Sequence, residues 1–214
     1  MSRGIVVMGE SGSGKTTAMR TLNPEETYYI DCDGKGLSWK GWREQYNTAK
    51  KNYYRTTEQG VIEKLMENVS EKAPKIKNIV IDTINSVMVA DERRRIEEKS
   101  YDKWSDLAWS VYDICIDASQ LRDDLNIIVL AHVQTEIDDN TGERFTRILT
   151  NGRKLNKIGL EKYFTTVFLA KKSGDNYVFE THANKSTAKT PMGAFEQNEI
   201  PNDMQAALDV LKDY

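Results

Sequence analysis

The sequence has very few cysteines and no long apolar run. Cys32 and Cys115 are its only cysteines, and they lie too far apart to form a metal-binding pair. This excludes a disulfide-rich scaffold and favours a reduced, cytoplasmic setting. No stretch approaches the roughly 20 apolar residues that a membrane span requires. The apolar run after Met1 is too short for a secretory signal. We therefore expect no membrane association.

The sequence also lacks a strong excess of charge, internal repeats and any linker rich in proline and glycine. Its formal net charge is -3, so contact with nucleic acid would require a local basic patch. Apolar residues make up 39% and charged residues 29%, which is typical of a globular protein. A chain of 214 residues can bury one sizeable core, so we predict a single domain over residues 1–214.

Short apolar runs alternate with longer amphipathic stretches, which predicts an α/β fold with a mostly parallel central sheet flanked by helices. The predicted strands span residues 4–8, 27–31, 78–82, 126–131, 164–170 and 176–181. The predicted helices span residues 15–22, 57–72, 104–125 and 203–214. Residues 135–149 have the pattern of a late β-hairpin that turns at Asn140-Thr141-Gly142.

The segment GESGSGKT follows the first predicted strand and matches the phosphate-loop pattern G-x-x-x-x-G-K-[ST] at every fixed position. Glycines let the backbone bend around phosphates, and the following helix adds its positive end. Lys15 would reach the β and γ phosphates, and the Thr16 hydroxyl would bind Mg²⁺. The predicted ATP-binding residues are Gly9, Glu10, Ser11, Gly12, Ser13, Gly14, Lys15, Thr16 and Thr17. The alternative is a glycine-rich turn with no ligand.

Asp82 ends the apolar run IVID, the expected position of a carboxylate that holds Mg²⁺ together with Thr16. The alternative is that Asp82 only caps the next helix. In many ATPases a second carboxylate follows directly and activates the attacking water, but here Thr83 follows. If the protein hydrolyses ATP, its base must lie elsewhere, and the segment IDCD offers Asp31 and Asp33. Either of these could instead cap a helix or lie in a solvated turn.

Three segments, in this order, resemble the core of RecA-type recombinases. IDCD is similar to the family's I-D-A-E segment beyond the second strand, with Asp33 in the place of the catalytic glutamate. IIVLAHVQ is similar to the fourth strand and its γ-phosphate-sensing polar pair, which gives His132 and Gln134 as candidates. THANKSTAKTP is similar to a segment whose lysines reach the neighbouring subunit's nucleotide, and Lys185 and Lys189 match it loosely. Ordinary polar and surface roles are the alternatives.

The resemblance covers about residues 4–191, and the chain looks like the reduced, phage-encoded RecA-core proteins associated with single-strand annealing. It implies a RecA-like P-loop NTPase core with a DNA-stimulated, Mg²⁺-dependent ATPase activity that uses ATP. The catalytic candidates that it implies are Lys15, Asp33, Asp82, His132 and Gln134. It also implies single-stranded DNA as a partner, promotion of annealing or homologous recombination, and a ring or filament with the nucleotide between subunits. A single-strand-binding protein would be a further partner, in the host cytoplasm.

Two stretches fall where the family has its DNA-binding loops. Residues 144–157 carry five basic side chains and no acid, and the alternative to DNA binding is a plain basic hairpin. The predicted DNA-binding residues are Arg144, Arg147, Arg153, Lys154 and Lys157. Residues 89–104 contain the run RRR diluted by acids, which is more typical of a solvated helix face. The aromatic segment 37–55 is more typical of a core or subunit interface than of a base-stacking platform.

Two other functions use the same phosphate-loop scaffold. A nucleoside or nucleotide kinase would need an arginine-rich lid, for which the RRR run in residues 89–104 is the candidate. A nucleotide-switched, helicase-loading partner would bind ATP without using Asp33 as a base. Transfer of phosphate to a nucleoside or nucleotide would support the kinase. An unchanged hydrolysis rate after Asp33→Ala would exclude Asp33 as the base.

Overall fold

The computed structural model describes residues 1–98, 102–137, 142–151 and 159–214. Its strands are β1 (Arg3–Met8), β2 (Thr27–Asp31), β3 (Tyr53–Arg55), β4 (Asn78–Asp82), β5 (Asn126–Ala131), β6 (Val133–Ile137), β7 (Arg144–Ile148), β8 (Thr166–Ser173), β9 (Asn176–Glu180) and β10 (Glu199–Pro201). Its helices are α1 (Lys15–Ala18), α2 (Trp42–Gln45), α3 (Gln59–Lys72), α4 (Ile84–Arg94), α5 (Asp102–Asp117) and α7 (Met204–Leu211), with 3-10 turns η1 (Met19–Thr21) and η2 (Leu160–Tyr163). In the described part of the chain, none of the helices is both long and apolar enough to span a membrane.

Eight strands form one sheet in the order β10-β9-β8-β1-β5-β4-β2-β3. Neighbouring strands from β8 to β3 are parallel, and β9 and β10 add antiparallel strands at one edge. This confirms the predicted mostly parallel sheet. The register places Asp82 beside Asp31 of β2 and Leu130 of β5, so the C-terminal ends of these strands meet at one edge. Ligands of open parallel sheets bind at such an edge.

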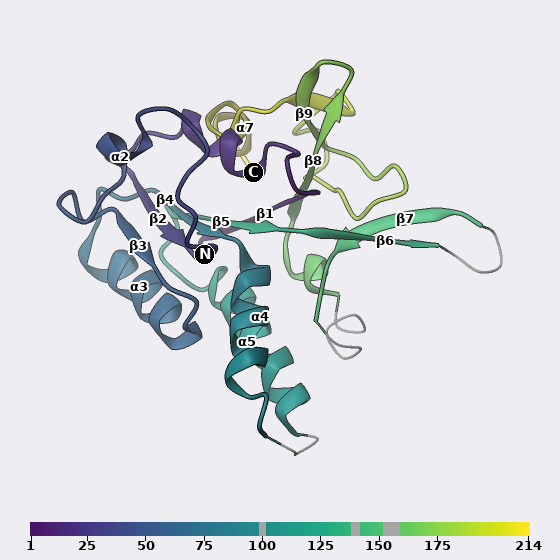
Figure 1. The fold of residues 1–214 in the computed structure, drawn as a ribbon. Coiled ribbons are helices and arrows are strands. Elements are labelled where there is room, and N and C mark those ends of the chain that lie inside the picture. The colour runs from purple at the N-terminus through teal and green to yellow at the C-terminus, as the bar shows by residue number, and fades with distance from the viewer. Residues whose placement is uncertain (99–101, 138–141, 152–158) are drawn as a thin grey trace.

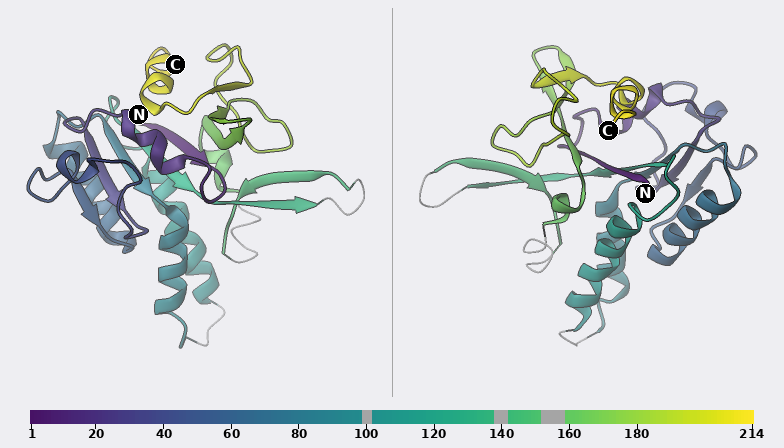
Figure 2. Two further views of the ribbon diagram at one scale, coloured as in Figure 1. Left: turned by 45° about the horizontal axis from the view of Figure 1, so that its top comes forward. Right: turned by 180° about the vertical axis from the view of Figure 1, so that it is seen from behind.

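Helices cover both faces of the sheet, because the central strands carry apolar side chains on both sides (Figures 1 and 2). In β1, Val6 and Met8 face a core shared with α3, α4 and α5, whereas Ile5 and Val7 face a second core shared with α1 and α7. The aromatic segment between β2 and β3 packs into the second core, where Tyr46 is 1% exposed. This confirms its interpretation as core.

Two pairs of elements project from the sheet in different directions, the hairpin β6–β7 and the helix pair α4–α5 (Figure 1). In the hairpin, Val133 lies opposite Ile148 and Ile137 lies opposite Arg144. The predicted hairpin is confirmed, although β6 begins at Val133 rather than Thr135, because the chain stays extended after β5. Part of the predicted turn, residues 140–141, lies outside the described residues.

Helix α5 ends at Asp117, well before the predicted Leu125. The Ser2 hydroxyl donates to the Ala118 carbonyl (2.8 Å) and accepts from the Leu121 N–H (3.0 Å), so the N-terminal segment binds backbone groups that would otherwise continue the helix. Helix α1 is also shorter than predicted and gives way to the turn η1. The sequence pattern did not predict α2, β3 and β10, because three or four residues carry almost no periodicity.

Both cysteines are expected to resist alkylation in the native protein. Their thiols are free, with Cys32 4% and Cys115 3% exposed. Burial raises the pKa of both thiols, that of Cys115 to about 12, and the thiolate is the reactive form. After iodoacetamide treatment at mildly alkaline pH, mass spectrometry should therefore detect alkylated Cys32 and Cys115 in denaturant and neither of them in the native protein. Equal labelling rates in native and denatured protein would contradict this burial.

Candidate nucleotide-binding site

The phosphate loop joins β1 to α1 at the C-terminal edge of the sheet. The Gly9 N–H donates to the Ala131 carbonyl (3.0 Å), which ties the start of the loop to the end of β5. A Cβ atom at Gly9 would lie 2.5 Å from the Ala170 carbonyl oxygen, so glycine is required there. Gly12 and Gly14 have φ values of 78° and 93°, which glycine adopts without strain. The loop thus has the tight backbone that a phosphate cradle needs.

Lys15 and Thr16 open α1 and are 6% and 8% exposed. The Lys15 ammonium donates to the carbonyls of Gly9 (2.7 Å) and Glu10 (2.8 Å), so it lies against the loop. Burial lowers the pKa of Lys15 to about 8, although nearby Asp82 opposes this shift. A largely buried ammonium beside this glycine-rich loop favours an anionic ligand.

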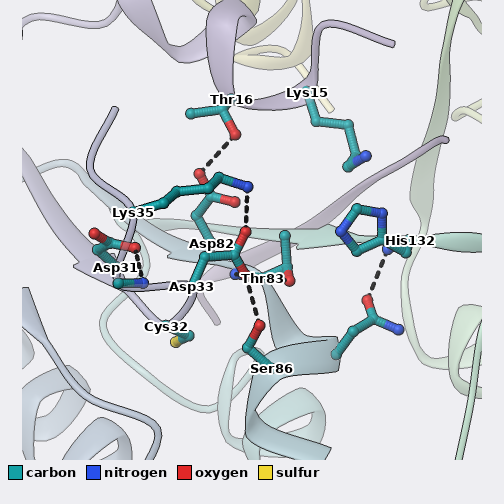
Figure 3. Close-up of polar contacts among 12 residues, drawn as sticks. Lys15, Thr16, Asp31, Cys32, Asp33, Lys35, Asp82, Thr83, Ser86 and His132 are labelled. Atoms are coloured by element: carbon teal, nitrogen blue, oxygen red, sulfur yellow. Dashed lines mark hydrogen bonds and ion pairs between the residues drawn. The ribbon is translucent and has the colours of Figure 1, made fainter. Parts of the chain in front are cut away.

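Asp82 lies directly beneath Thr16, as the sequence predicted (Figure 3). Its Oδ2 accepts hydrogen bonds from the Thr16 hydroxyl (2.8 Å) and from the Tyr29 hydroxyl (2.6 Å). Its Oδ1 is buried and has no hydrogen-bond partner. Burial raises the pKa of Asp82 to about 6, and the hydrogen bonds from Tyr29 and Thr16 oppose that shift. Thr16 and Asp82 therefore place two oxygen-bearing side chains together, and Asp82 Oδ1 has an unused capacity to accept a hydrogen bond or to bind a cation.

A divalent cation fits this pair of residues. Asp82 Oδ1 and the Thr16 hydroxyl are oxygen donors, and Mg²⁺ at nucleotide sites uses one or two such donors together with phosphates and water. Among the described residues, no group of three or more His, Cys, Asp or Glu side chains could hold a metal without a nucleotide. The donor set therefore suits Mg²⁺ that arrives with a nucleotide.

Asp31 shapes the loop that follows β2. Its carboxylate accepts hydrogen bonds from the N–H groups of Gly34 (2.7 Å) and Gly36 (3.0 Å) and from the Tyr53 hydroxyl (2.6 Å). Both carboxylate oxygens of Asp31 therefore already accept hydrogen bonds from neighbouring groups of the same chain. Asp31 thus has the turn-forming role that the sequence left open, which leaves Asp33 as the acid of this segment beside the cavity.

Asp33 lies near the cavity, but its oxygens are engaged. Oδ1 accepts from the Thr83 N–H (3.2 Å), the Thr83 hydroxyl (2.8 Å) and the Ser86 hydroxyl (2.6 Å), and Oδ2 forms an ion pair with Lys35 (Figure 3). Burial would raise the pKa of Asp33, but the hydrogen bonds from Lys35, Ser86 and Thr83 outweigh it and lower the pKa to about 2. With these partners Asp33 orients neighbouring groups well and accepts a proton poorly.

His132 and Gln134, the two predicted γ-phosphate sensors, have separate surroundings. His132 lines the cavity beside the phosphate loop, and its backbone N–H donates to Asn85 Oδ1 (2.7 Å). Burial and nearby Lys15 lower the pKa of His132, so it is mostly neutral near pH 7. Gln134 lies on the hairpin, where its amide donates to Glu136 (2.8 Å). The structure therefore brings His132 to the site and places Gln134 on the hairpin.

A cavity of about 230 Å³ lies over the phosphate loop. Its lining residues are Ser11, Gly12, Gly14, Lys15, Thr16, Thr17, Lys35, Ser38, Thr83, His132 and Tyr177. Sequence reasoning missed Lys35, Ser38 and Tyr177, because they reach the loop from the β2–α2 connection and from β9. The segment DGKG directly after the second predicted strand, at the same edge of the sheet, was the signal that could have indicated Lys35.

Lys185 and Lys189 do not line this cavity. The Lys185 carbonyl accepts from the Thr146 N–H of β7 (2.8 Å), and its ammonium lies 3.8 Å from Glu143. Lys189 pairs with Val167 of β8 through two backbone hydrogen bonds (2.8 and 2.9 Å). Both lysines thus lie along the hairpin and β8, away from the phosphate loop of their own chain.

Two of the predicted DNA-binding residues, Arg144 and Arg147, lie on β7 of the hairpin. Arg144 is exposed on β7, and Arg147 on the same strand lies 3.9 Å from Glu136. Three of the predicted residues lie outside the described part of the chain: Arg153, Lys154 and Lys157.

The arginine run on α4 is largely paired within the chain. Arg94 contacts Glu58 and Asp91, and Arg95 contacts Asp91 (3.1 Å) and Asp106 (3.3 Å). This confirms the solvated helix face. None of these arginines lines the cavity, which counts against a kinase lid.

A phosphate-cradling loop that meets a threonine–aspartate pair at the edge of a parallel sheet defines the class of the protein as a P-loop nucleotide-binding domain. A family model described as an AAA domain matches residues 1–192. The chain therefore belongs to this family, for which nucleotide-binding ATPase activity is the function class. No curated protein matches the chain.

Proposed function

We propose that the protein hydrolyses ATP in a RecA-like manner, binds single-stranded DNA and promotes strand annealing or homologous recombination. The observation that carries this proposal is the direct connection between the cavity and the β6–β7 hairpin, which carries Arg144 and Arg147. β5 ends at Ala131, His132 lines the cavity, and β6 begins at Val133. A single residue, which itself lines the cavity, therefore separates β5 from the hairpin.

The side chain of Asn85 strengthens this connection. It accepts from the backbone N–H of His132 (2.7 Å) and donates to the Leu149 carbonyl (2.7 Å), while the Leu149 N–H donates to the His132 carbonyl (2.8 Å). Asn85 lies in the first turn of α4, three residues after Asp82. Short hydrogen bonds thus join the first turn of α4, which follows Asp82, to His132 and to the residue after β7.

The hairpin offers groups that suit a single strand. Arg144 is exposed and can bind a phosphate, and the Phe145 ring is 42% exposed and can stack on a base. Such contacts read the backbone and the base faces rather than a sequence. This supports binding of single-stranded DNA with little sequence preference, as annealing requires.

We assign the residues at the cavity separate roles in hydrolysis. The loop N–H groups and Lys15 would bind the phosphates, and Thr16 with Asp82 Oδ1 would hold Mg²⁺, which would supply charge neutralisation at the phosphates. Asp33 would orient the attacking water, and His132 would contact the γ-phosphate. The stimulation of turnover by DNA would result from the hairpin holding His132 in place.

The assembly that we propose is a ring or filament with the nucleotide between subunits. Lys185 and Lys189 lie away from their own phosphate loop, so they are available to a neighbour's nucleotide. The resemblance to phage-encoded RecA-core proteins supports the same assembly, action in the host cytoplasm, and a single-strand-binding protein as partner.

The test is ATP turnover and solution mass with and without single-stranded DNA, in wild type and in Arg144→Glu. We expect DNA to stimulate the wild type, and the charge reversal to weaken DNA affinity about tenfold at low salt while turnover without DNA is unchanged. Lys64→Glu, on the exposed side of α3, is the control with the same charge change. Protein that binds ATP but shows no stimulation at low salt would contradict the proposal, as would equal effects of the two variants.

A nucleotide-switched partner protein that turns over ATP very slowly is the second candidate. The engaged oxygens of Asp33 favour it, because a carboxylate with a pKa of about 2 is a weak base. Asp33→Ala distinguishes the two functions. An unchanged slow hydrolysis rate would favour the switch, and a large loss of turnover would favour the ATPase.

A further inference from the structure

Lys35 has a position that the roles described above do not explain. It lies in the loop after β2, between Gly34 and Gly36, whose φ values of 69° and 80° and whose hydrogen bonds to Asp31 fix the backbone on both sides. Its side chain is 56% exposed and extends to Asp33 (Figure 3). A rigid loop thus presents a long, flexible cation at the site.

Lys35 lines the same cavity as the phosphate loop. Among the described residues, Lys15 and Lys35 are the two lysines of that lining, and they come from different segments, α1 and the β2–α2 connection. Lys15 belongs to the loop that cradles the phosphates. A phosphate chain held by the loop would therefore also have the Lys35 ammonium within the same small space of about 230 Å³.

We propose that Lys35 reads the γ-phosphate by exchanging partners, binding Asp33 in the absence of ATP and the terminal phosphate in its presence. The inference rests on the proposed ATP-binding function and adds a second phosphate-binding residue to it. A terminal phosphate carries more charge than a carboxylate, so it competes successfully for a lysine whose side chain is free to move. ADP lacks that group, so Lys35 returns to Asp33.

The exchange changes Asp33 in a defined way. Oδ1 keeps its hydrogen bonds from Thr83 and Ser86, which fix the carboxylate, while Oδ2 loses Lys35 and becomes available to a water molecule. Asp33 is thus engaged without ATP and open with ATP. Because Ser86 lies in the first turn of α4, its retained hydrogen bond keeps Asp33 tied to the start of that helix in both states.

The experiment measures the affinity for ATPγS and for ADP, each with Mg²⁺, in wild type, Lys35→Met and Asp33→Asn. Lys35→Met should weaken ATPγS binding about tenfold or more and change ADP binding less than about twofold, because one charged contact to the γ-phosphate is lost. Asp33→Asn should bind ATPγS at least as tightly as wild type, because the competing carboxylate charge is removed. Lys40→Met, an exposed lysine of the same segment, should match wild type.

The opposite directions of the two variants exclude a merely structural ion pair, since loss of either partner of such a pair would weaken binding alike. Unchanged ATPγS affinity in Lys35→Met, equal losses for ATPγS and ADP, or weaker ATPγS binding in Asp33→Asn would each overturn the inference. Failure of the wild type to bind ATPγS and ADP would instead overturn the proposed function itself. ADP binding by Lys35→Met also shows that this variant is folded.

Discussion

Replacing Lys15 with alanine is expected to lower the affinity for ATPγS at least about 100-fold and to remove measurable ATP turnover. Lys15 is 6% exposed, and its ammonium donates to the carbonyls of Gly9 and Glu10 in the loop. It is thus already positioned where the phosphates would bind, and no other described side chain of the loop carries a positive charge. Fluorescence titration with a labelled nucleotide measures the affinity.

The pH dependence gives a second measurement of the same lysine. Burial lowers the pKa of Lys15 to about 8, and only the charged form attracts phosphate, so wild-type affinity should fall as the pH rises through about 8. Lys15→Ala should lose this dependence. Lys40→Ala is the matched control, because it removes an exposed lysine that does not line the cavity. If Lys15→Ala melts like wild type and still binds within a few-fold, the loop does not bind phosphate as described.

The local part of the site could be predicted from the sequence. The phosphate loop is a contiguous pattern, and Asp82 is marked by the strand that it ends, so both were recognised without any knowledge of contacts. Tyr29 could not be recognised, because its bond to Asp82 depends on the register between β2 and β4 and on residues 53 positions apart. The same holds for Tyr177, which reaches the loop from an antiparallel strand on the other side of β1.

For the fold as well, features set by a local sequence pattern were predicted, and features set by long-range contacts were not. The buried strands were predicted because their apolar runs are unbroken, whereas the end of α5 was misplaced because Ser2, distant in sequence, binds backbone groups just beyond Asp117. His132 and Gln134 were predicted as a pair of γ-phosphate sensors because IIVLAHVQ resembles the fourth strand of RecA-type proteins. Alternation along one extended strand would put residues 132 and 134 on the same side, but His132 lies between β5 and β6, whereas Gln134 already belongs to the hairpin. Sequence proximity is therefore a poor guide at a strand end.

Replacing Asp82 with asparagine should separate the stability of the protein from its activity. Turnover with Mg²⁺ should fall about 100- to 1,000-fold, because the substitution removes the charge that would hold the cation beside Thr16. Nucleotide affinity without a metal should change only a few-fold. The asparagine oxygen can still accept from Thr16 and Tyr29, so the packing around position 82 is kept.

Stability without metal or nucleotide should rise in this variant. Burial raises the pKa of Asp82 from 3.8 to about 6, so the native state favours the protonated form. The resulting penalty is absent below pH 3.8, grows as the pH rises and reaches about 3 kcal/mol above pH 6. Urea unfolding in EDTA should therefore show Asp82→Asn more stable than wild type, by about 1 kcal/mol more at pH 7.5 than at pH 5.

Asp31 supplies the matched control at the neighbouring strand end. It pairs with Asp82 in the sheet register, but both of its oxygens accept hydrogen bonds, from Gly34, Gly36 and Tyr53. Asp31→Asn replaces one acceptor with a donor and should lower stability by about 1–3 kcal/mol. Opposite signs for the two substitutions would show that Asp82 carries an uncompensated charge, as a metal ligand does. A loss of stability in both, or Mg²⁺-dependent turnover retained in Asp82→Asn, would contradict its assignment.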